Sequence, residues 1–337
     1  MKKLSFVFLF FILSSSFNFY IPLKLNNKEL PVYYNNQRFS YNSDYQSYET
    51  NSHTQFNFDS LSIPIKRAGN LILIETVIDG QRGNLIFDSG SVSELVLNKT
   101  YFREYKKKGN KSITGINGTI QEIDIIEVDS IMISEMVFEE KYVDLIDLGQ
   151  IENRTGVKIL GFFGLQLIKN FEIIIDIHNN ELQLFKLNKK GNRINSGEGI
   201  EKYNYTQDIE IYNNVLFIWA KVAGKKLRFC FDTAAEKNIM SHILRKKIIS
   251  TIRITGRVKL LGAGSSRKEV LFGKMNDFML GEKQIKNMET LIADIGALNQ
   301  IYGTFISGVL GYELLNHGKI SINISKKQFG IIYNKGN

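Results

Sequence analysis

Two stretches decide the fold of this chain: Leu85-Ile86-Phe87-Asp88-Ser89-Gly90-Ser91 and Arg228-Phe229-Cys230-Phe231-Asp232-Thr233-Ala234-Ala235. In each stretch an apolar, strand-forming run ends in an aspartate that a small hydroxyl residue follows. The two aspartates are 144 positions apart, and the residues upstream of them keep the same spacing, which pairs Gly80 with Gly224, Ile78 with Val222, and Ile74 with Ile218. An internal repeat of this length predicts two similar lobes, each with one carboxylate at an equivalent place.

The repeat continues downstream at a spacing of 147 positions. Gly115 then corresponds to Gly262, residues 131–133 correspond to 278–280, and residues 161–165 correspond to 308–312. A single Asp-Ser-Gly sequence is also an ordinary turn. Two copies in the same strand context, each followed by the same Gly-x-x-Gly element, are much harder to obtain by chance. The repeat therefore indicates a shared site rather than two unrelated turns.

Short apolar runs broken by Gly, Asn and Asp fill the chain from Leu61 onward. The clearest runs are at residues 70–78, 84–87, 120–128, 171–177 and 182–187. Runs of this kind at short spacing predict an all-β fold with two β-barrel-like lobes and a cleft between them, not βαβ units. Hairpin turns are expected at residues 178–180 and 325–327, and short helices at 165–170 and 312–316.

The expected organisation has five parts. Residues 1–16 have a basic start, an apolar run and a small-residue end, as in a signal peptide. An N-terminal arm or pro-segment (17–60), the first lobe (61–187), a linker (188–204) and the second lobe (205–337) follow. The first apolar run is short for a membrane span, although residues 17–20 prolong it and leave an uncleaved anchor as the alternative. We expect an exported monomer, periplasmic, cell-surface or secreted, without a stable membrane span in the mature chain.

Composition excludes several other classes of function. Cys230 is the only cysteine, so no intramolecular disulfide can form, and its alternating strand context indicates a small buried residue rather than a nucleophile. The net charge of +9 comes from scattered lysine clusters, which predict a solvated surface rather than a nucleic-acid interface. The four histidines lack metal-ligand spacing. We expect neither a metal nor a cofactor.

The repeated aspartates suggest a specific chemistry. If the lobes pack about a pseudo-twofold axis, Asp88 and Asp232 meet there, and two carboxyls so close share one proton. The ionised acid can then act as a general base toward a water molecule, while the protonated acid donates to the carbonyl oxygen that the water attacks. Such a pair is suited to amide hydrolysis without metal or covalent intermediate.

At these residues the sequence resembles the aspartic protease superfamily, pepsin-like and retropepsin-like. The resemblance is greatest to exported bacterial proteins that carry two retropepsin-like repeats in one chain, and it covers roughly residues 61–334. The family pattern is apolar-apolar-Asp-Ser/Thr-Gly, followed later by apolar-apolar-Gly. The chain matches it at residues 86–90 with 162–164, and at residues 230–234 with 309–311.

The resemblance implies an aspartic endopeptidase whose catalytic dyad is Asp88 and Asp232 and whose substrates are peptides or unfolded proteins. Ser89 and Gly90 would support the dyad from the first copy, and Thr233 and Ala234 from the second. In particular, the two hydroxyls would bond across the lobes beneath the dyad. The flap candidates are Gly115, Gly118, Gly262 and Gly264.

Ala234 departs from the family pattern, which has glycine there. Alanine resists positive φ, and Ala235 lacks the hydroxyl of Ser91, so Asp232 is expected to be somewhat harder to ionise than Asp88. If φ is negative at Ala234, the residue costs little. Two alternatives to the protease remain at this point: a non-catalytic bilobed protein that binds a peptide or a protein partner in the cleft, and a purely structural β-protein.

Overall fold

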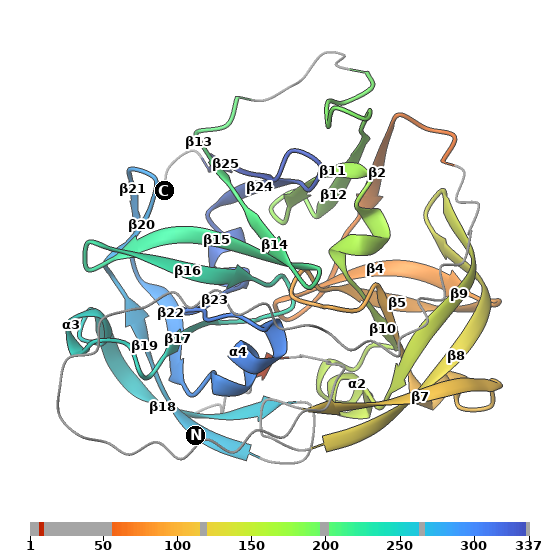
Figure 1. The fold of residues 1–337 in the computed structure, drawn as a ribbon, viewed down its shortest axis with the longest axis horizontal. Helices are drawn as coiled ribbons and strands as arrows, with labels where there is room; N and C mark the ends of the chain where they lie inside the picture. The colour runs from red at the N-terminus through yellow and green to blue at the C-terminus, as the bar shows by residue number, and fades with distance from the viewer. Residues whose placement is uncertain (1–6, 10–55, 115–119, 196–201, 263–266, 335–337) are drawn as a thin grey trace.

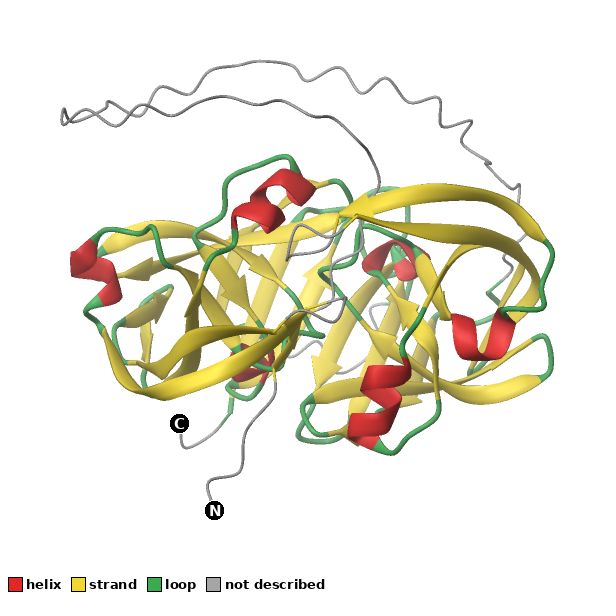
Figure 2. Ribbon diagram, turned by 90° about the horizontal axis from the view of Figure 1, so that it is seen from below, coloured by secondary structure: helices red, strands yellow, loops and turns green. Residues whose placement is uncertain are grey.

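The protein, seen in a computed structural model, is described over residues 7–9, 56–114, 120–195, 202–262 and 267–334. Strands dominate these residues, and they form two lobes that lie side by side (Figures 1 and 2). The first lobe contains β2 (Ser60–Pro64), β3 (Lys66–Ala68), β4 (Leu71–Ile78), β5 (Gln81–Phe87), β6 (Leu95–Asn98), α1 (Lys99–Phe102), β7 (Lys107–Thr114), β8 (Ile120–Ile133), β9 (Met136–Ile146), α2 (Gly149–Thr155), β10 (Ile159–Phe163), the 3-10 helix η1 (Leu165–Ile168), β11 (Phe171–Asp176) and β12 (Glu181–Lys186).

The second lobe repeats this order of elements. It contains β13 (Tyr205–Asp208), β14 (Glu210–Tyr212), β15 (Val215–Val222), β16 (Lys225–Phe231), β17 (Asn238–Ser241), α3 (Lys246–Ile249), β18 (Ile252–Gly262), β19 (Arg267–Met275), β20 (Phe278–Leu280), β21 (Lys283–Ile285), β22 (Met288–Ala293), α4 (Gly296–Tyr302), β23 (Gly308–Leu310), α5 (Tyr312–Leu315), β24 (Gly318–Asn323) and β25 (Gln328–Tyr333).

The same three strands form the centre of each lobe. In the first lobe β10 lies between β5, which runs parallel to it, and β6, which runs antiparallel. In the second lobe β23 lies between β16 and β17 in the same way. Every residue of β10 and of β23 is buried. The apolar composition of these two strands follows from burial on both faces.

A tight hairpin leads into each strand that ends at an aspartate. Asp79 and Gly80 connect β4 to β5 with φ of 46° and 79°, and Ala223 and Gly224 connect β15 to β16 with φ of 51° and 69°. Two consecutive residues with positive φ are typical of the two-residue turn that matches the twist of paired strands. This turn explains why the glycines of the pair recur at the spacing of the repeat.

The first glycine of each Gly-x-x-Gly element lies where two strands approach closely. A Cβ atom on Gly161 would lie 2.0 Å from the carbonyl oxygen of Val96, and one on Gly308 would lie 2.1 Å from that of Ile239. Side-chain atoms do not fit at such distances. Glycine is therefore required at these positions by strand packing, independently of any role in chemistry.

A six-stranded sheet joins the lobes, in the order β13-β25-β24-β11-β12-β2. Its central pair is β11 of the first lobe and β24 of the second, which run antiparallel from Glu172 opposite Asn323 to Ile175 opposite Ile320. In Figure 1 this sheet occupies the upper part of the molecule, and β7 and β18 lie along the lower edge.

A buried polar network holds the connecting segment against this sheet. The Glu172 carboxylate accepts hydrogen bonds from Arg193 Nε at 3.0 Å and from Ser321 Oγ at 2.9 Å, and it also accepts one from the Tyr203 hydroxyl. Burial opposes ionisation of Glu172, but the bonds from Arg193 and Tyr203 hold its pKa below the usual value. Residues of both lobes and of the segment between them therefore meet at one carboxylate.

Most expected elements are present, with shifted bounds. The runs expected to form strands correspond to β4, β5, β8, β11 and β12, and the two short helices correspond to η1 and α5. Asn180 and Lys327 have positive φ in the expected hairpin turns. Four short helices, α1 to α4, were not expected from the sequence.

Several expectations concern residues outside the described ranges. These are most of the signal peptide, the arm up to residue 55, and the flap candidates Gly115, Gly118 and Gly264. Within the expected signal peptide, strand β1 (Val7–Leu9) pairs in parallel with residues 260–262 of β18. Gly262 is the last residue of β18. None of the helices in the described part of the chain has the length and apolarity to cross a membrane.

Candidate active site

The backbone ladder of each lobe continues into the turn that carries its aspartate. The backbone N–H of Asp88 donates to the carbonyl oxygen of Phe163 at 2.9 Å, and that of Asp232 donates to the carbonyl oxygen of Leu310 at 2.9 Å. The strand that bears the Gly-x-x-Gly element therefore fixes the point at which β5 or β16 ends. This pairing is the structural reason that the two motifs recur together.

The second glycine of each element lets the turn pack directly on the strand. A Cβ atom on Gly164 would lie 2.7 Å from the carbonyl oxygen of Ser93, and one on Gly311 would lie 2.0 Å from that of Ala235. Both positions are equivalent in the repeat. The backbone of each turn after the aspartate therefore packs directly against the glycine, where any side chain would clash.

Four hydrogen bonds cross between the lobes beneath the aspartates. The Ser89 N–H donates to Thr233 Oγ1 at 3.0 Å, and the Thr233 N–H donates to Ser89 Oγ at 2.9 Å. Each hydroxyl then donates to a carbonyl oxygen of the opposite lobe, Ser89 Oγ to Phe231 at 2.9 Å and Thr233 Oγ1 to Phe87 at 2.7 Å. Both hydroxyl residues are fully buried, so each lobe satisfies polar groups of the other.

Asp88 and Asp232 are buried, with 1% and 0% of their surface exposed. Asp88 Oδ1 accepts from the Gly90 N–H at 2.9 Å. Asp232 Oδ1 accepts from the N–H groups of Ala234 and Ala235 at 2.8 and 3.1 Å. Within the described residues, Asp232 Oδ2 has no hydrogen bond of standard geometry to a protein atom. One oxygen of this carboxyl is therefore free to take part in proton transfer.

The two carboxyls do not titrate alike. Burial, followed by the nearby charge of Asp232, raises the pKa of Asp88 well above its usual value. Burial also raises the pKa of Asp232, but the N–H donors of Ala234 and Ala235 and the contact with Asp88 lower it, which leaves it at about 6. Because the carboxyls interact, they titrate as a pair, and the two N–H donors to Asp232 favour it as the acid that ionises first.

This order is the reverse of what the sequence led us to expect. Ala235 was expected to make Asp232 the harder acid to ionise, because Ser91 of the first copy has a hydroxyl. In the structure Ser91 Oγ instead donates to the carbonyl oxygen of Ser93 at 2.9 Å and accepts from the Ser93 N–H at 3.2 Å. The hydroxyl is used within its own turn, while Ala235 serves Asp232 through its backbone N–H. The Ser91 hydroxyl thus gives Asp88 no advantage over Asp232, because the backbone N–H groups of the turns, including that of Ser91, supply the hydrogen bonds that lower each pKa.

The structure also explains the alanine at position 234. Neither Gly90 nor Ala234 has a positive φ, so alanine is not strained there. The Ala234 side chain is buried in an apolar cluster of the first lobe that includes Leu73 and Phe162. A Cβ atom on Gly90, by contrast, would lie 2.7 Å from Asp232 Cγ. Glycine is needed in the first copy, and a methyl group is accommodated in the second.

Cys230 takes no part in this site. Its thiol is buried and donates to the Tyr302 hydroxyl at 3.4 Å, and burial raises its pKa well above the usual value.

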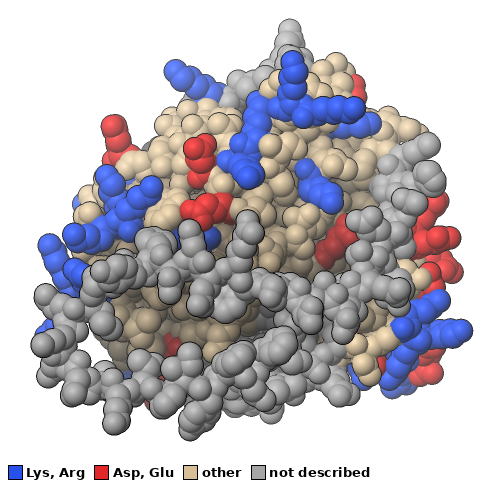
Figure 3. Space-filling view, viewed as in Figure 1, with Lys and Arg blue, Asp and Glu red and all other residues tan. Residues whose placement is uncertain are grey.

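Among the described residues, no three His, Cys, Asp or Glu side chains are arranged to hold a metal ion. On the face shown in Figure 3, basic and acidic side chains are interspersed.

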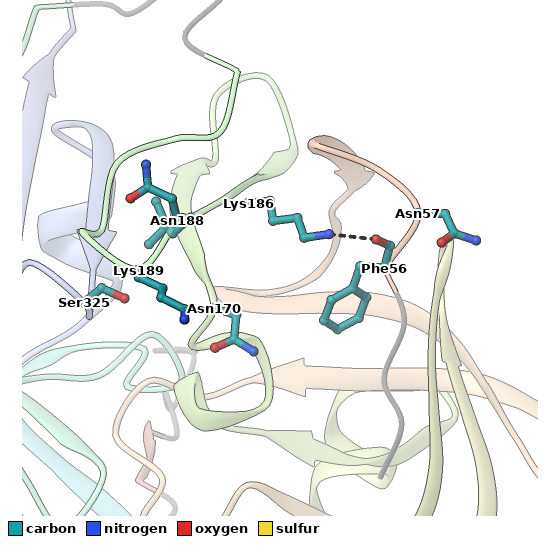
Figure 4. Close-up of a pocket in the computed structure, with 8 residues that line it drawn as sticks. Phe56, Asn57, Asn170, Lys186, Asn188, Lys189 and Ser325 are labelled. Atoms are coloured by element: carbon teal, nitrogen blue, oxygen red, sulfur yellow. Dashed lines mark hydrogen bonds between the residues drawn. The ribbon is translucent and has the colours of Figure 1, made fainter.

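The structure also has a hollow of about 570 Å³ away from the two turns (Figure 4). Its lining comprises Phe56, Asn57, Asn170, Lys186, Leu187, Asn188, Lys189 and Ser325. Lys186 Nζ donates to the carbonyl oxygen of Phe56 at 3.0 Å within it. The lining has no carboxylate, thiol or histidine, and it lies outside both aspartate turns. The dyad is therefore the better candidate for a catalytic site.

Comparison with known proteins finds a family match within the second repeat. Residues 218–314, from β15 to α5, match a family model described as aspartyl protease. The crystal structure of an aspartic proteinase from Irpex lacteus is similar, with a TM-score of 0.49 and 10% sequence identity, over 82% of this chain and 98% of that chain. No curated protein matches the sequence significantly. Over the second repeat, the family match agrees with the superfamily that the motifs indicated.

Exchanging glycine and alanine between the two turns tests how they are packed. We expect Gly90→Ala to destabilise the protein by about 2–3 kcal/mol, because its Cβ meets the Asp232 carboxyl. Ala234→Gly should cost only about 1 kcal/mol, from the lost methyl contact and the added backbone freedom. Thermal unfolding of both variants measures the difference. A stabilised Ala234→Gly variant would contradict the negative φ.

Replacing one buried acid should make stability less dependent on pH. The raised pKa of Asp232 means that its ionisation costs stability as pH rises from about 4 to about 6. Asp232→Asn removes this cost, so at pH 7 we expect the variant to be more stable than the wild type by about 2 kcal/mol. The difference should disappear below pH 4. Calorimetry from pH 3 to 8 would show it, and a constant difference would argue against the raised pKa.

Proposed function

We propose that this chain, whose second repeat matches an aspartyl protease family model, is an endopeptidase that uses Asp88 and Asp232 as its catalytic dyad. The observation that supports it most is the symmetry of the two turns. Each aspartate follows an equivalent strand, and the hydroxyl residue after it is cross-bonded to the other lobe. This arrangement brings two buried carboxyls together without any other evident structural purpose.

The different pKa values of the two acids assign their roles. Asp232, which ionises first, acts as the general base and takes a proton from the attacking water molecule. Asp88, which keeps its proton, donates it to the carbonyl oxygen of the scissile peptide bond. The resulting tetrahedral intermediate collapses when a proton passes to the leaving amine. Because each acid has a separate task, neither can substitute for the other.

The non-catalytic alternative was based on Ala234, and the structure removes that support. The backbone there has no positive φ, and its N–H donates to Asp232 as the equivalent glycine donates to Asp88. We therefore retain hydrolysis as the proposal. Its substrates are peptides or unfolded proteins, because an extended backbone is needed to present an amide to two buried acids.

Export is part of the same proposal. The basic start, the apolar run and the serines at 14–16 support a signal peptide that directs the protein to the periplasm, cell surface or medium. N-terminal sequencing of the protein recovered from fractionated cells tests this. Cleavage near residue 16 is the expected result, and an intact Met1 in the cytosolic fraction would contradict export.

Substitution of either acid should abolish hydrolysis while the fold is kept. We expect Asp88→Asn and Asp232→Asn each to reduce kcat/KM on an unstructured protein at least about 10⁴-fold, because each acid carries a proton-transfer step. In the wild type, activity should rise as Asp232 ionises near pH 6 and fall at higher pH as Asp88 loses its proton.

A pH profile of kcat/KM on a quenched peptide measures these limbs, and circular dichroism controls for folding. An optimum below pH 4 would contradict the assignment of Asp232 as the base. Substantial activity in either purified asparagine variant would contradict the dyad itself.

A further inference from the structure

The residue four positions after each aspartate packs against the opposite lobe. After Asp88 this residue is Val92, whose carbonyl oxygen accepts from Asn214 Nδ2 at 2.8 Å. Its side chain packs against an apolar cluster of the second lobe that includes Ile301 of α4. We call this contact the apolar joint.

After Asp232 the equivalent residue is Glu236. Its carbonyl oxygen accepts from Asn70 Nδ2 at 3.2 Å, and Asn70 corresponds to Asn214 in the repeat. Its carboxylate, however, forms an ion pair with Arg154 of α2, with 2.6 Å between Oε1 and Nη1. Arg154 corresponds to Ile301 at the spacing of 147. We call this contact the ionic joint, because charged residues stand at the positions equivalent to Val92 and Ile301 of the apolar joint.

The ionic joint is largely withdrawn from solvent. The side chains of Glu236 and Arg154 are 9% and 23% exposed. Burial raises the pKa of Glu236, while Arg154 and, less strongly, Lys237 favour its ionised form. Lys237 itself pairs with Glu289 and Glu313 of its own lobe. Arg154 is therefore the residue of the first lobe that forms an ion pair with the segment after Asp232.

We propose that Arg154 is a positioning residue, which holds Glu236 from the first lobe and so fixes the turn that binds Asp232. Glu236 directly follows Ala235, and Ala234 and Ala235 supply the two N–H donors to Asp232 Oδ1. A shift of Glu236 moves both donors relative to the carboxylate. Arg154 would thus act on the proposed dyad indirectly, through Glu236 and the turn, and this inference rests on the proposed function.

The chain itself supplies the test, because the apolar joint shows which pair fits this place. Arg154→Ile and Glu236→Val each leave one charge of a buried pair behind, which destabilises proteins strongly. The double variant Arg154→Ile/Glu236→Val places at both positions the residues that the apolar joint has at the equivalent positions, Ile301 and Val92. We expect each single variant to lower kcat about 10- to 100-fold with KM nearly unchanged, and the double variant to recover most of the loss.

Two further measurements separate positioning from general stability. The pKa of Asp232, followed by carbon NMR of labelled aspartates, should rise in Arg154→Ile, because the N–H donors that lower it are displaced. It should return in the double variant. Arg154→Lys, which keeps the charge, should stay near the wild type. Arg103→Ile, which removes an exposed arginine, is the matched control and should change nothing.

The outcomes also separate this inference from the proposed function. A wild type without peptidase activity overturns the function, while the NMR titration and the unfolding temperatures still report on the joint. If the single variants unfold at lower temperature but keep kcat and the pKa of Asp232, Arg154 is structural only and the proposal fails. Additive losses in the double variant would also overturn it.

Discussion

The exchange of hydrogen bonds between Ser89 and Thr233 is the constraint on which the rest of the site depends. Each residue donates and accepts across the boundary between the lobes, and all the groups involved are buried. An unpaired buried donor or acceptor would cost about 1–3 kcal/mol. The two turns are thereby held face to face, although burying two carboxyls together is itself unfavourable.

The repeat supplies a symmetric frame, and a few residues make it asymmetric. Gly90 faces the Asp232 carboxyl at a distance that excludes a side chain, whereas the methyl group of Ala234 packs among apolar residues of the first lobe. The joints differ in the same way, apolar beside one acid and ionic beside the other. Two close carboxyls share a proton whether or not they are identical, and such a difference favours one of them as the acid that ionises first.

The sequence predicted the architecture well because the repeat is a long-range signal. Two copies of an apolar run, an aspartate and a later Gly-x-x-Gly element predicted the all-β fold, its two lobes and the candidate pair of acids. The order of the pKa values was not predictable, since it depends on burial and on which backbone N–H groups donate to each carboxyl. The Arg154–Glu236 pair was missed because its partners are far apart in sequence. Arg154 and Ile301 occupy equivalent positions in the two repeats, and this difference between a charged and an apolar residue was the signal that could have revealed the pair.

The antiparallel pair of β11 and β24 has a consequence for synthesis of the protein. Glu172 lies opposite Asn323, so the sheet beneath both lobes cannot close before β24 has been made. Contacts of such long sequence separation form slowly, because a long loop must close first. The nascent chain therefore carries both acids for some time without the framework that aligns them. The proposed peptidase site is thus incomplete until β24, which lies well after the second aspartate, has been added to the sheet.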